Sequence, residues 1–201
     1  VDFLSKNYNV LVIDNLSSGK LSNLKESYNK IKFFKYDLSK MNLKVFYRKI
    51  KRIDYIFHLA ALADIVPSIN SPINYVNSNI FATYKVLEIA KKYKVKKIIY
   101  SASSSCYGIT KDVPTKTTSK VYPRYPYAHT KFIAEQAIIH WSLVYKIDYL
   151  SFRFFNVYGP RARTNGTYGA VFGTFLAQIL NKQPLTIVGT GKQKRDFIYV
   201  S

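Results

Sequence analysis

The chain has 201 residues, of which 31 are basic and 11 acidic, so its formal net charge is +20. Apolar residues make up 48% of it, which is enough for a packed core and excludes a disordered or collagen-like chain. The single cysteine, Cys106, excludes an internal disulfide and a multi-cysteine metal site. No apolar run of about 18 residues is present, which excludes a membrane-spanning helix.

The positive charge is compatible with nucleic acid, an anionic membrane or a phosphorylated substrate. Most of the basic residues are lysines spread along the chain, which is also rich in Asn, Ile, Tyr and Phe. This profile is typical of an AT-rich coding sequence. The densest group, Lys91 to Lys97, lies where a predicted helix ends, a place that suits cations. We therefore favour compositional bias and expect neither nucleic acid nor a membrane as a partner.

Five short apolar runs predict strands at residues 9–14, 31–36, 55–61, 97–102 and 148–155. Because these runs are nearly continuous, they favour parallel strands that are covered on both faces. Two longer stretches between them carry apolar residues at helical spacing and predict amphipathic helices. Strand–helix–strand alternation of this kind predicts an α/β fold, a Rossmann-like doubly wound parallel sheet.

The predicted helices cover residues 74–93 and 127–146. After about residue 156 the pattern changes to a loop, a helix near 170–180 and two short strands. We therefore divide the chain into a first domain, 1–155, and the start of a second, 156–201. The chain begins with an apparent helix tail and stops within a strand-like run, so we expect truncation at both ends.

In open α/β sheets, ligands bind beyond the carboxyl ends of the strands. Asp14 closes the first strand, where a dinucleotide fold places an acid that binds the adenosine ribose. Hydroxyl side chains from Ser101 to Ser105 close the fourth strand and could hydrogen-bond a ligand. Taken alone, Asp14 could equally be a strand stop, and the serines are better explained as a polar turn.

Tyr127 and Lys131 lie one helical turn apart at the start of a predicted helix. A free tyrosine has a pKa of about 10 and is a poor base at neutral pH. A neighbouring ammonium and a cationic nicotinamide ring would favour the phenolate and lower this pKa. Together with a strand-end serine, this pair predicts a proton-transfer site beside a hydride acceptor.

A series of motifs runs in a characteristic order along the whole chain. They are Asp14 to Lys20, Asp37-Leu38, His58 to Ala61, Asn79 to Thr83, the serine run ending at Tyr107-Gly108, Tyr127 to Lys131, Arg153 to Arg161, Gly189 to Gly191, and Arg195 to Phe197. In these motifs the chain resembles the extended short-chain dehydrogenases/reductases, specifically nucleotide-sugar epimerases of the UDP-glucose 4-epimerase type.

The resemblance implies an NAD-binding domain at 1–155, a substrate-binding domain beginning at 156, and roles for individual residues. Catalysis would use Ser103, Tyr127 and Lys131. The implied cofactor-binding residues are Asp14, Asn15, Asp37, Leu38, Leu59, Ala60, Ala61, Asn79, Ser101, Tyr127, Lys131 and Phe154. The implied substrate-binding residues are Ser103, Ser104, Ser105, Asn156, Arg161 and Arg195, in which the guanidinium groups suit a diphosphate.

In such an enzyme, Tyr127 takes the proton of the sugar C4 hydroxyl while NAD accepts hydride from C4, and hydride then returns to the opposite face of a 4-keto sugar. Related dehydratases and decarboxylases carry an acid in the serine segment, and none stands at 103–105, which favours an epimerase of a UDP-hexose or UDP-N-acetylhexosamine. A nucleotide-sugar dehydratase or reductase, and a basic nucleic-acid-binding protein, remain the alternatives.

The glycine-rich loop of the family is absent from these residues, so we expect this stretch alone to be inactive. The two predicted helices match those that pair subunits in the family, which implies a homodimer by analogy. We expect a cytoplasmic protein. The spacing of His129 and His140 makes no zinc site with any acid, so no metal is expected, and His58 and Cys106 are predicted to be packed in the core.

Overall fold

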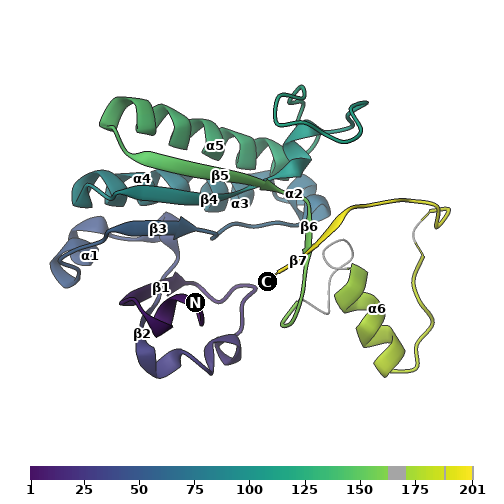
Figure 1. Cartoon of the computed structure of the whole chain (residues 1–201), viewed down its shortest axis with the longest axis horizontal. Helices are drawn as coiled ribbons and strands as arrows, with labels where there is room; N and C mark the ends of the chain where they lie inside the picture. Colours follow the sequence, from purple (N-terminus) through teal and green to yellow (C-terminus); the bar gives the residue numbers. More distant parts are fainter. Residues whose placement is uncertain (163–170, 188, 201) are drawn as a thin grey trace.

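The computed structural model describes residues 1–162, 171–187 and 189–200. It is an α/β structure, as predicted (Figure 1). Its strands are β1 Val10–Asp14, β2 Ile31–Lys35, β3 Tyr55–His58, β4 Lys97–Ser103, β5 Asp148–Phe154, β6 Asn156–Tyr158 and β7 Phe197–Tyr199. Its helices are α1 Leu43–Lys49, α2 Ile65–Asn70, α3 Pro72–Tyr75, α4 Ala82–Tyr93, α5 Pro126–Tyr145 and α6 Val171–Leu180.

All described strands pair in parallel, in three groups: β1 with β2, β3 with β4 and β5, and β6 with β7. Parallel neighbours end at the same edge of a sheet, so β3, β4 and β5 deliver their carboxyl ends together. In the register of β4 and β5, Ser103 stands opposite Phe154. Two predicted site residues from distant parts of the chain are thereby neighbours.

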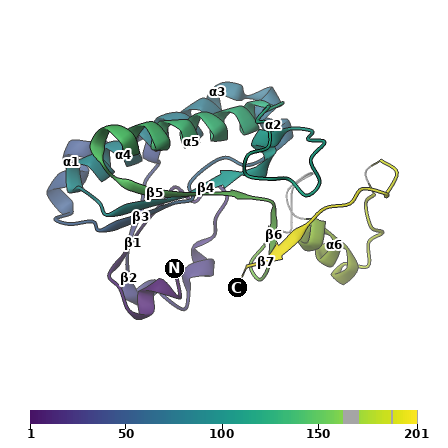
Figure 2. The same cartoon turned by 45° about the horizontal axis from the view of Figure 1, so that its top comes forward.

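Helices α4 and α5 lie on one face of the β3–β4–β5 sheet (Figure 2). Their small and branched residues pack on alternate residues of β4, because successive strand side chains point to opposite faces. The main core cluster consists of Leu87, Ala90, Val95, Ile98, Tyr100, Ala102, Ala134, Ala137, Ile138 and Ile147. This packing ties the start of α5, with Tyr127 and Lys131, to the end of β4.

Among the described residues, helices cover one face of the β3–β4–β5 sheet. Side chains on the face away from α4 and α5 stay exposed, for example Tyr55 and Phe57 of β3 and Leu150 and Phe152 of β5. The reason is that α4 and α5 pack against the same face (Figure 2), so apolar character alone did not indicate which face would be covered.

The predicted helix at 74–93 is helical over its whole length but is not one regular α-helix. A π-helical segment, Val76–Phe81, connects α3 to α4. Segments of this kind occur often at functional sites, because the wider turn changes which side chains face inward. Here it brings Asn79 into the interior, where its side chain is 1% exposed.

The other strands up to β5 and helices α5 and α6 follow the predictions within a few residues. After residue 156 the order differs from the prediction: β6 lies where a loop was expected, and one described strand, β7, follows α6. Helix α5 begins with Pro126, whose fixed φ suits the first helical turn. The strand expected at 55–61 ends at His58, and the residues beyond it run along the edge of the sheet as a loop. In the described ranges, no helix combines the length and the apolar character needed to cross a membrane.

Candidate active site at the carboxyl edge of the sheet

A hydroxyl cluster forms where β4 ends. Ser103, the last residue of the strand, accepts a hydrogen bond from the backbone N–H of Ser105 at 3.2 Å, and the two hydroxyl oxygens lie 2.7 Å apart. A short 3-10 turn, Ser104–Tyr107, follows and holds Ser104 half-buried beside them. The predicted serine triplet is therefore a compact group of donors and acceptors rather than an extended loop.

Tyr127 of α5 lies against this cluster. Burial raises the pKa of Tyr127, while hydrogen bonds with the Ser103 and Ser105 side chains oppose the rise. The Tyr75 ring packs edge-on against Tyr127, with the centroids 6.4 Å apart. The predicted pair of Ser103 and Tyr127 is thus brought together, but the protein groups around Tyr127 do not by themselves lower its pKa.

Lys131 lies one turn further along α5 and is 4% exposed. Its Nζ atom stands 4.3 Å from the centroid of the Tyr100 ring. Burial lowers the pKa of Lys131 to about 7, and the charge of Glu135 opposes this lowering. Within the described residues Nζ forms no hydrogen bond or ion pair, so a buried donor is left available for a ligand hydroxyl.

The Asn79 side chain forms hydrogen bonds with both the loop after β3 and helix α5. Its amide oxygen accepts from the Leu62 N–H at 2.8 Å, and its amide nitrogen donates to Leu62 O at 3.1 Å and Thr130 Oγ1 at 3.0 Å. Both amide hydrogens are therefore engaged within the protein. Asn79 thus supports Leu62, which directly follows the Leu59–Ala60–Ala61 segment, and its predicted place near the cofactor's phosphate or ribose stays a prediction.

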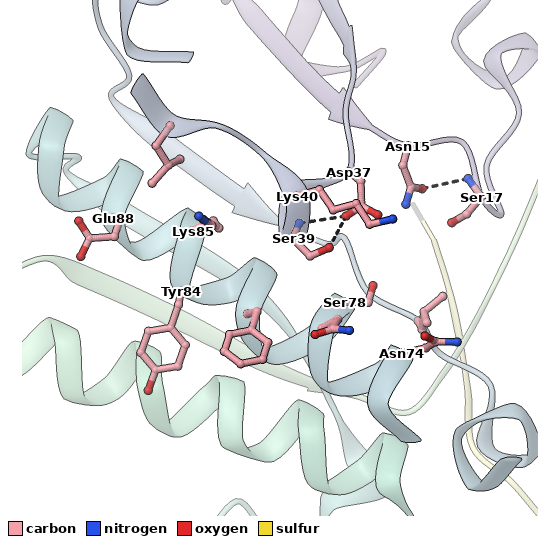
Figure 3. Close-up of a pocket in the computed structure, with 14 residues that line it drawn as sticks. Asn15, Ser17, Asp37, Ser39, Lys40, Asn74, Ser78, Tyr84, Lys85 and Glu88 are labelled. Carbon is pink, nitrogen blue, oxygen red and sulfur yellow. Dashed lines mark hydrogen bonds between the residues drawn. The ribbon is translucent and has the colours of Figure 1, made fainter. Parts of the chain in front are cut away.

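A cavity of about 740 Å³ opens beside the ends of β1 and β2 (Figure 3). Polar residues line one side of it, with Asn15, Ser17, Asp37, Ser39 and Lys40 among them. Asn15 Oδ1 accepts from the Ser17 N–H at 2.9 Å, and Asp37 Oδ1 accepts from the Ser39 N–H at 2.9 Å. Ser17, Ser39 and Lys40 were not predicted, although their places directly after Asp14 and Asp37 could have indicated them.

Asp14 closes β1 next to this cavity. Its Oδ1 atom accepts from the Leu16 N–H at 2.7 Å, which shapes the turn after the strand. Hydrogen bonds from the Ser39 side chain hold the pKa of Asp37 below its ordinary value. The predicted Leu38 packs with its side chain toward the cluster of Met41 and Phe46.

The other predicted cofactor residues follow the strand ends. Leu59 and Ala60 are exposed just beyond β3, and Ala61 is half-buried. Ser101 lies half-buried in β4 opposite Phe152, and Phe154 is 39% exposed beside Ser103.

The predicted substrate residues of the second domain divide into two groups. Asn156 opens β6 and donates to the carbonyl of Asp196 at 2.9 Å, so it lies next to the segment that carries Arg195. Arg195 is exposed and donates to Lys194 O at 2.8 Å. The pairing of β6 with β7 brings these two predicted residues to the same region, although 39 residues of chain separate them.

Arg161 is directed elsewhere in this structure. Its guanidinium pairs with Asp2 at 2.6 Å and with Glu26 at 3.3 Å, and it donates to the carbonyl of Asn23. Arg161 thereby fastens the chain after β6 to the N-terminal segment. Its predicted contact with substrate has no support from these contacts and stays a prediction.

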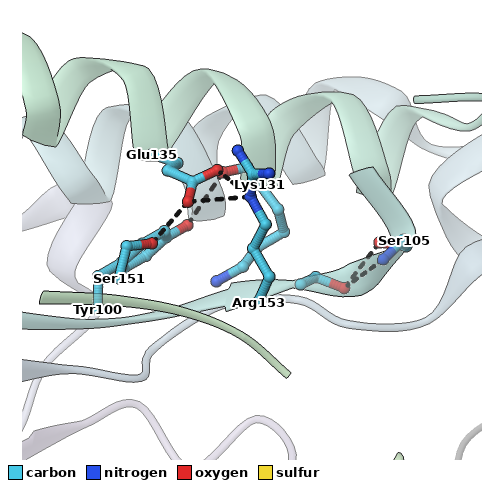
Figure 4. A network of polar contacts seen from close by, with 7 residues as sticks. Tyr100, Ser105, Lys131, Glu135, Ser151 and Arg153 are labelled. Carbon is cyan, nitrogen blue, oxygen red and sulfur yellow. Dashed lines mark hydrogen bonds and ion pairs between the residues drawn. The ribbon is translucent and has the colours of Figure 1, made fainter. Parts of the chain in front are cut away.

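Sequence reasoning missed a buried polar network behind Lys131. Glu135 of α5 pairs with Arg153 of β5, with 3.0 Å between Arg153 Nε and Glu135 Oε2, and Ser151 donates to Glu135 Oε1 at 2.7 Å (Figure 4). A signal existed, because Glu135 is a lone acid four residues after Lys131 in a mostly apolar helix. The strand partners could not be paired with it from the sequence.

Two core predictions are confirmed. His58 is 3% exposed, its Nε2 lies 2.8 Å from Thr83 Oγ1, and burial lowers the pKa of His58 to about 3. Cys106 is 1% exposed, and burial raises the pKa of its thiol to about 11, which does not suit a nucleophile. Among the described residues, no group of three His, Cys, Asp or Glu side chains is arranged to hold a metal ion.

A model of the NAD dependent epimerase/dehydratase family matches residues 1–201. The chain belongs to this family. A putative UDP-glucose 4-epimerase of Methanocaldococcus jannaschii is 31% identical to it over 200 residues, which is 98% of this chain and 63% of that protein.

Solved structures agree with the family assignment. The UDP-N-acetylglucosamine 4-epimerase of Methanobrevibacter ruminantium M1, in complex with UDP-N-acetylmuramic acid, is 40% identical with a TM-score of 0.93 over 100% of this chain and 64% of that one. The UDP-glucose 4-epimerase of Thermotoga maritima with UDP-glucose is 33% identical, with a TM-score of 0.91 over 98% and 63%. The chain thus spans less than two thirds of the length of these relatives.

Membership of the epimerase/dehydratase family confirms the predicted resemblance and identifies NAD as the cofactor of the family. The residues present fit that cofactor. Lys131 keeps a buried ammonium available as a donor, and Asn15 and Asp37 place polar atoms in the lining of the cavity at the ends of β1 and β2. Hydroxyl groups of a ribose are suitable partners for both kinds of group.

Proposed function

We propose that the protein to which these residues belong is an NAD-dependent nucleotide-sugar 4-epimerase acting on a UDP-hexose or UDP-N-acetylhexosamine. The observation that carries the proposal is the contact of Tyr127 with the Ser103–Ser105 hydroxyls, one helical turn from a buried lysine at the carboxyl edge of a parallel sheet. A tyrosine with hydroxyl partners and a nearby ammonium can accept a proton from a secondary alcohol.

Each residue then has a role. Tyr127 accepts the proton of the sugar C4 hydroxyl, and Ser103 hydrogen-bonds that hydroxyl and passes the proton to Tyr127. Lys131 binds the ribose next to the reacting ring and favours the phenolate by its charge. The residues at the ends of β1 and β2 would hold NAD, which would supply the hydride acceptor and donor for C4 on the way through a 4-keto sugar. Asn156 and Arg195 hold the diphosphate while the sugar turns.

The serine segment favours an epimerase over a dehydratase or decarboxylase. Elimination needs an acid–base group at a second carbon, and residues 103–105 are all serines. The described side chains next to Tyr127 are hydroxyl and aromatic groups from Ser103, Ser105 and Tyr75. The charge of Asp64 raises the pKa of Tyr127 and so disfavours the phenolate.

We also propose a homodimer built on α4 and α5. Large apolar side chains stay exposed on these helices, including Tyr84 near the start of α4 and Leu143 and Val144 near the end of α5. Exposed apolar patches of this kind are typical of protein interfaces. Because residues 1–201 contain no glycine-rich loop, we expect them to need the rest of the protein for turnover.

The test of the catalytic proposal is Tyr127→Phe in the full-length protein. Loss of one hydroxyl leaves the ring packing intact, so the melting temperature and NAD binding should be nearly unchanged while epimerase turnover falls at least about 100-fold. Tyr8→Phe, a change at an exposed tyrosine, is the matched control. Near-normal turnover of a folded Tyr127→Phe enzyme would remove Tyr127 from the role of base.

A further inference from the structure

Glu135 is a buried acid whose described hydrogen-bond partners all lie on strand β5. Ser151 donates to its Oε1 at 2.7 Å, and Arg153 Nε stands 3.0 Å from Oε2 and 3.2 Å from Oε1 (Figure 4). Ser151 and Arg153 are two residues apart, so they share the face of β5 that meets α5. Glu135 therefore connects the helix of Tyr127 and Lys131 to the strand that ends in Phe154.

Stability alone does not account for this arrangement. Glu135 is 4% exposed, and removing a carboxylate and a guanidinium from water costs several kcal/mol that the ion pair only about offsets. Apolar residues of the same size would hold a helix on a sheet equally well. An ion pair kept in the interior at this cost suggests an electrostatic task for the carboxylate.

Lys131 is the group on which that carboxylate acts. Glu135 follows it by four residues and therefore lies on the same face of α5. The ammonium is buried over the Tyr100 ring, and the Tyr100 hydroxyl donates to the Lys131 carbonyl at 3.3 Å, which fixes the turn between them. A buried ammonium tends to lose its proton, and a fixed anion nearby opposes that loss.

The groups that face Lys131 include a second source of charge besides Glu135. Arg153 carries a permanent positive charge, but its Nε is directed at the Glu135 carboxylate and its Cζ lies 4.9 Å from the centroid of the Tyr107 ring. His58, on β3, packs 5.4 Å from the Tyr100 ring and is neutral at physiological pH. Among the described groups, Glu135 is the one whose charge favours the ammonium.

We propose that Glu135, held in place by Arg153 and Ser151, is a positioning residue that keeps buried Lys131 protonated and α5 in register with β5. The effect of Glu135 on turnover rests on the proposed epimerase function, because a neutral Lys131 would no longer favour the phenolate of Tyr127. The effect of Glu135 on the protonation of Lys131 does not depend on that function.

The first test measures the protonation of Lys131 directly. Full-length protein labelled with ¹³C and ¹⁵N lysine is titrated by NMR, with Lys131→Met to assign the resonance. We expect Glu135→Gln to lower the midpoint of Lys131 by about one unit or more, which raises its neutral fraction at pH 6 about fivefold if the midpoint moves from 7 to 6. Glu135→Asp keeps the negative charge, so in this variant the midpoint of Lys131 should stay close to that of the unchanged protein.

A folded Glu135→Gln protein in which Lys131 titrates as in the unchanged protein would overturn the proposal. If the single variant does not fold, Glu135→Gln combined with Arg153→Met removes both charges and leaves no unpaired guanidinium. The double variant also lacks the Arg153 cation, so its reference is Arg153→Met alone: Lys131 should titrate at a lower pH in the double variant than in Arg153→Met, and equal midpoints in these two variants would also overturn the proposal.

The second test is the pH dependence of kcat. Glu135→Gln should move the upper pH limit of turnover to lower pH, because Lys131 loses its proton earlier, while KM for the nucleotide sugar changes little. A purely structural role predicts the same fractional loss of kcat at every pH, and that result would contradict the proposal. If the unchanged protein epimerises no nucleotide sugar, the proposed function fails, and the NMR titration still decides the role of Glu135.

Discussion

The hydroxyl oxygens of Ser103 and Ser105 lie 2.7 Å apart at the end of β4, and both side chains hydrogen-bond Tyr127. Hydrogen bonds to a charged group are worth about 1.5 to 3 kcal/mol. Ser103→Ala should therefore lower kcat about 10- to 100-fold and move the lower limit of the pH profile upward, since the pKa of Tyr127 rises further.

Ser105→Ala provides the comparison for that variant. The substitution removes a hydroxyl that contacts Ser103 and Tyr127 but keeps the N–H from which Ser103 accepts, so we expect a smaller loss of kcat than for Ser103→Ala. Equal losses in the two variants, with unchanged pH profiles, would contradict a direct role of Ser103 in proton transfer.

Asn79 should matter for stability more than for contact with the cofactor. Asn79→Ala leaves the half-buried N–H and carbonyl of Leu62 without their partner, at a cost of about 1 to 3 kcal/mol of unfolding free energy. Asn77→Ala, at an exposed position in the same π-helical segment, should change stability by less than about 0.5 kcal/mol. Chemical denaturation of the full-length protein measures both, and equal stabilities would be inconsistent with the role assigned to Asn79.

His58 should contribute to unfolding in acid. Its pKa is about 3 in the folded protein and about 6.5 when unfolded, so between these values the unfolded state binds more protons. The free energy of unfolding should fall by up to about 1.4 kcal/mol per unit as pH drops from 6.5 toward 3. His58→Gln can keep a hydrogen bond to Thr83 and should show a shallower fall, measured by denaturation at several pH values. An unchanged slope, with exposed His140→Gln as the control, would contradict this prediction.

If the dimer forms through α4 and α5, charges placed on these helices should dissociate it. Tyr84→Glu combined with Leu143→Glu places charges on the exposed faces of α4 and α5 and should convert a dimer of the full-length protein to a monomer in light-scattering measurements. Val113→Glu, at a residue 90% exposed in the loop after β4, should leave the dimer intact. A dimer that persists in the double variant would show that the subunits associate elsewhere.

Much of the fold could be predicted because the spacing of apolar residues along the sequence indicates the strands and helices. The apolar runs and the two long helices are local patterns, and a strand end followed later by a helix start brings Ser103 and Tyr127 to the same edge. The exposed face of β5 was not predictable, because an apolar run does not tell which of its faces a helix will cover.

The supporting residues of the site were harder to predict because they depend on packing between distant segments. The pairing of Glu135 with Arg153 exists only because α5 lies over β5. Asn79 turns inward because of a π-helical segment that regular helical spacing does not indicate. Arg161 fits a diphosphate by chemistry, yet its guanidinium pairs with Asp2 of the N-terminal segment.

The most direct measurement of the central claim is NMR of the full-length protein with UDP-glucose and, separately, UDP-N-acetylglucosamine, with absorbance at 340 nm followed in parallel. The account predicts that at least one sugar converts to its C4 epimer until both isomers are present at equilibrium, with no net consumption of added NADH. Stoichiometric loss of NADH, or a dehydrated or decarboxylated product in place of the epimer, would contradict it.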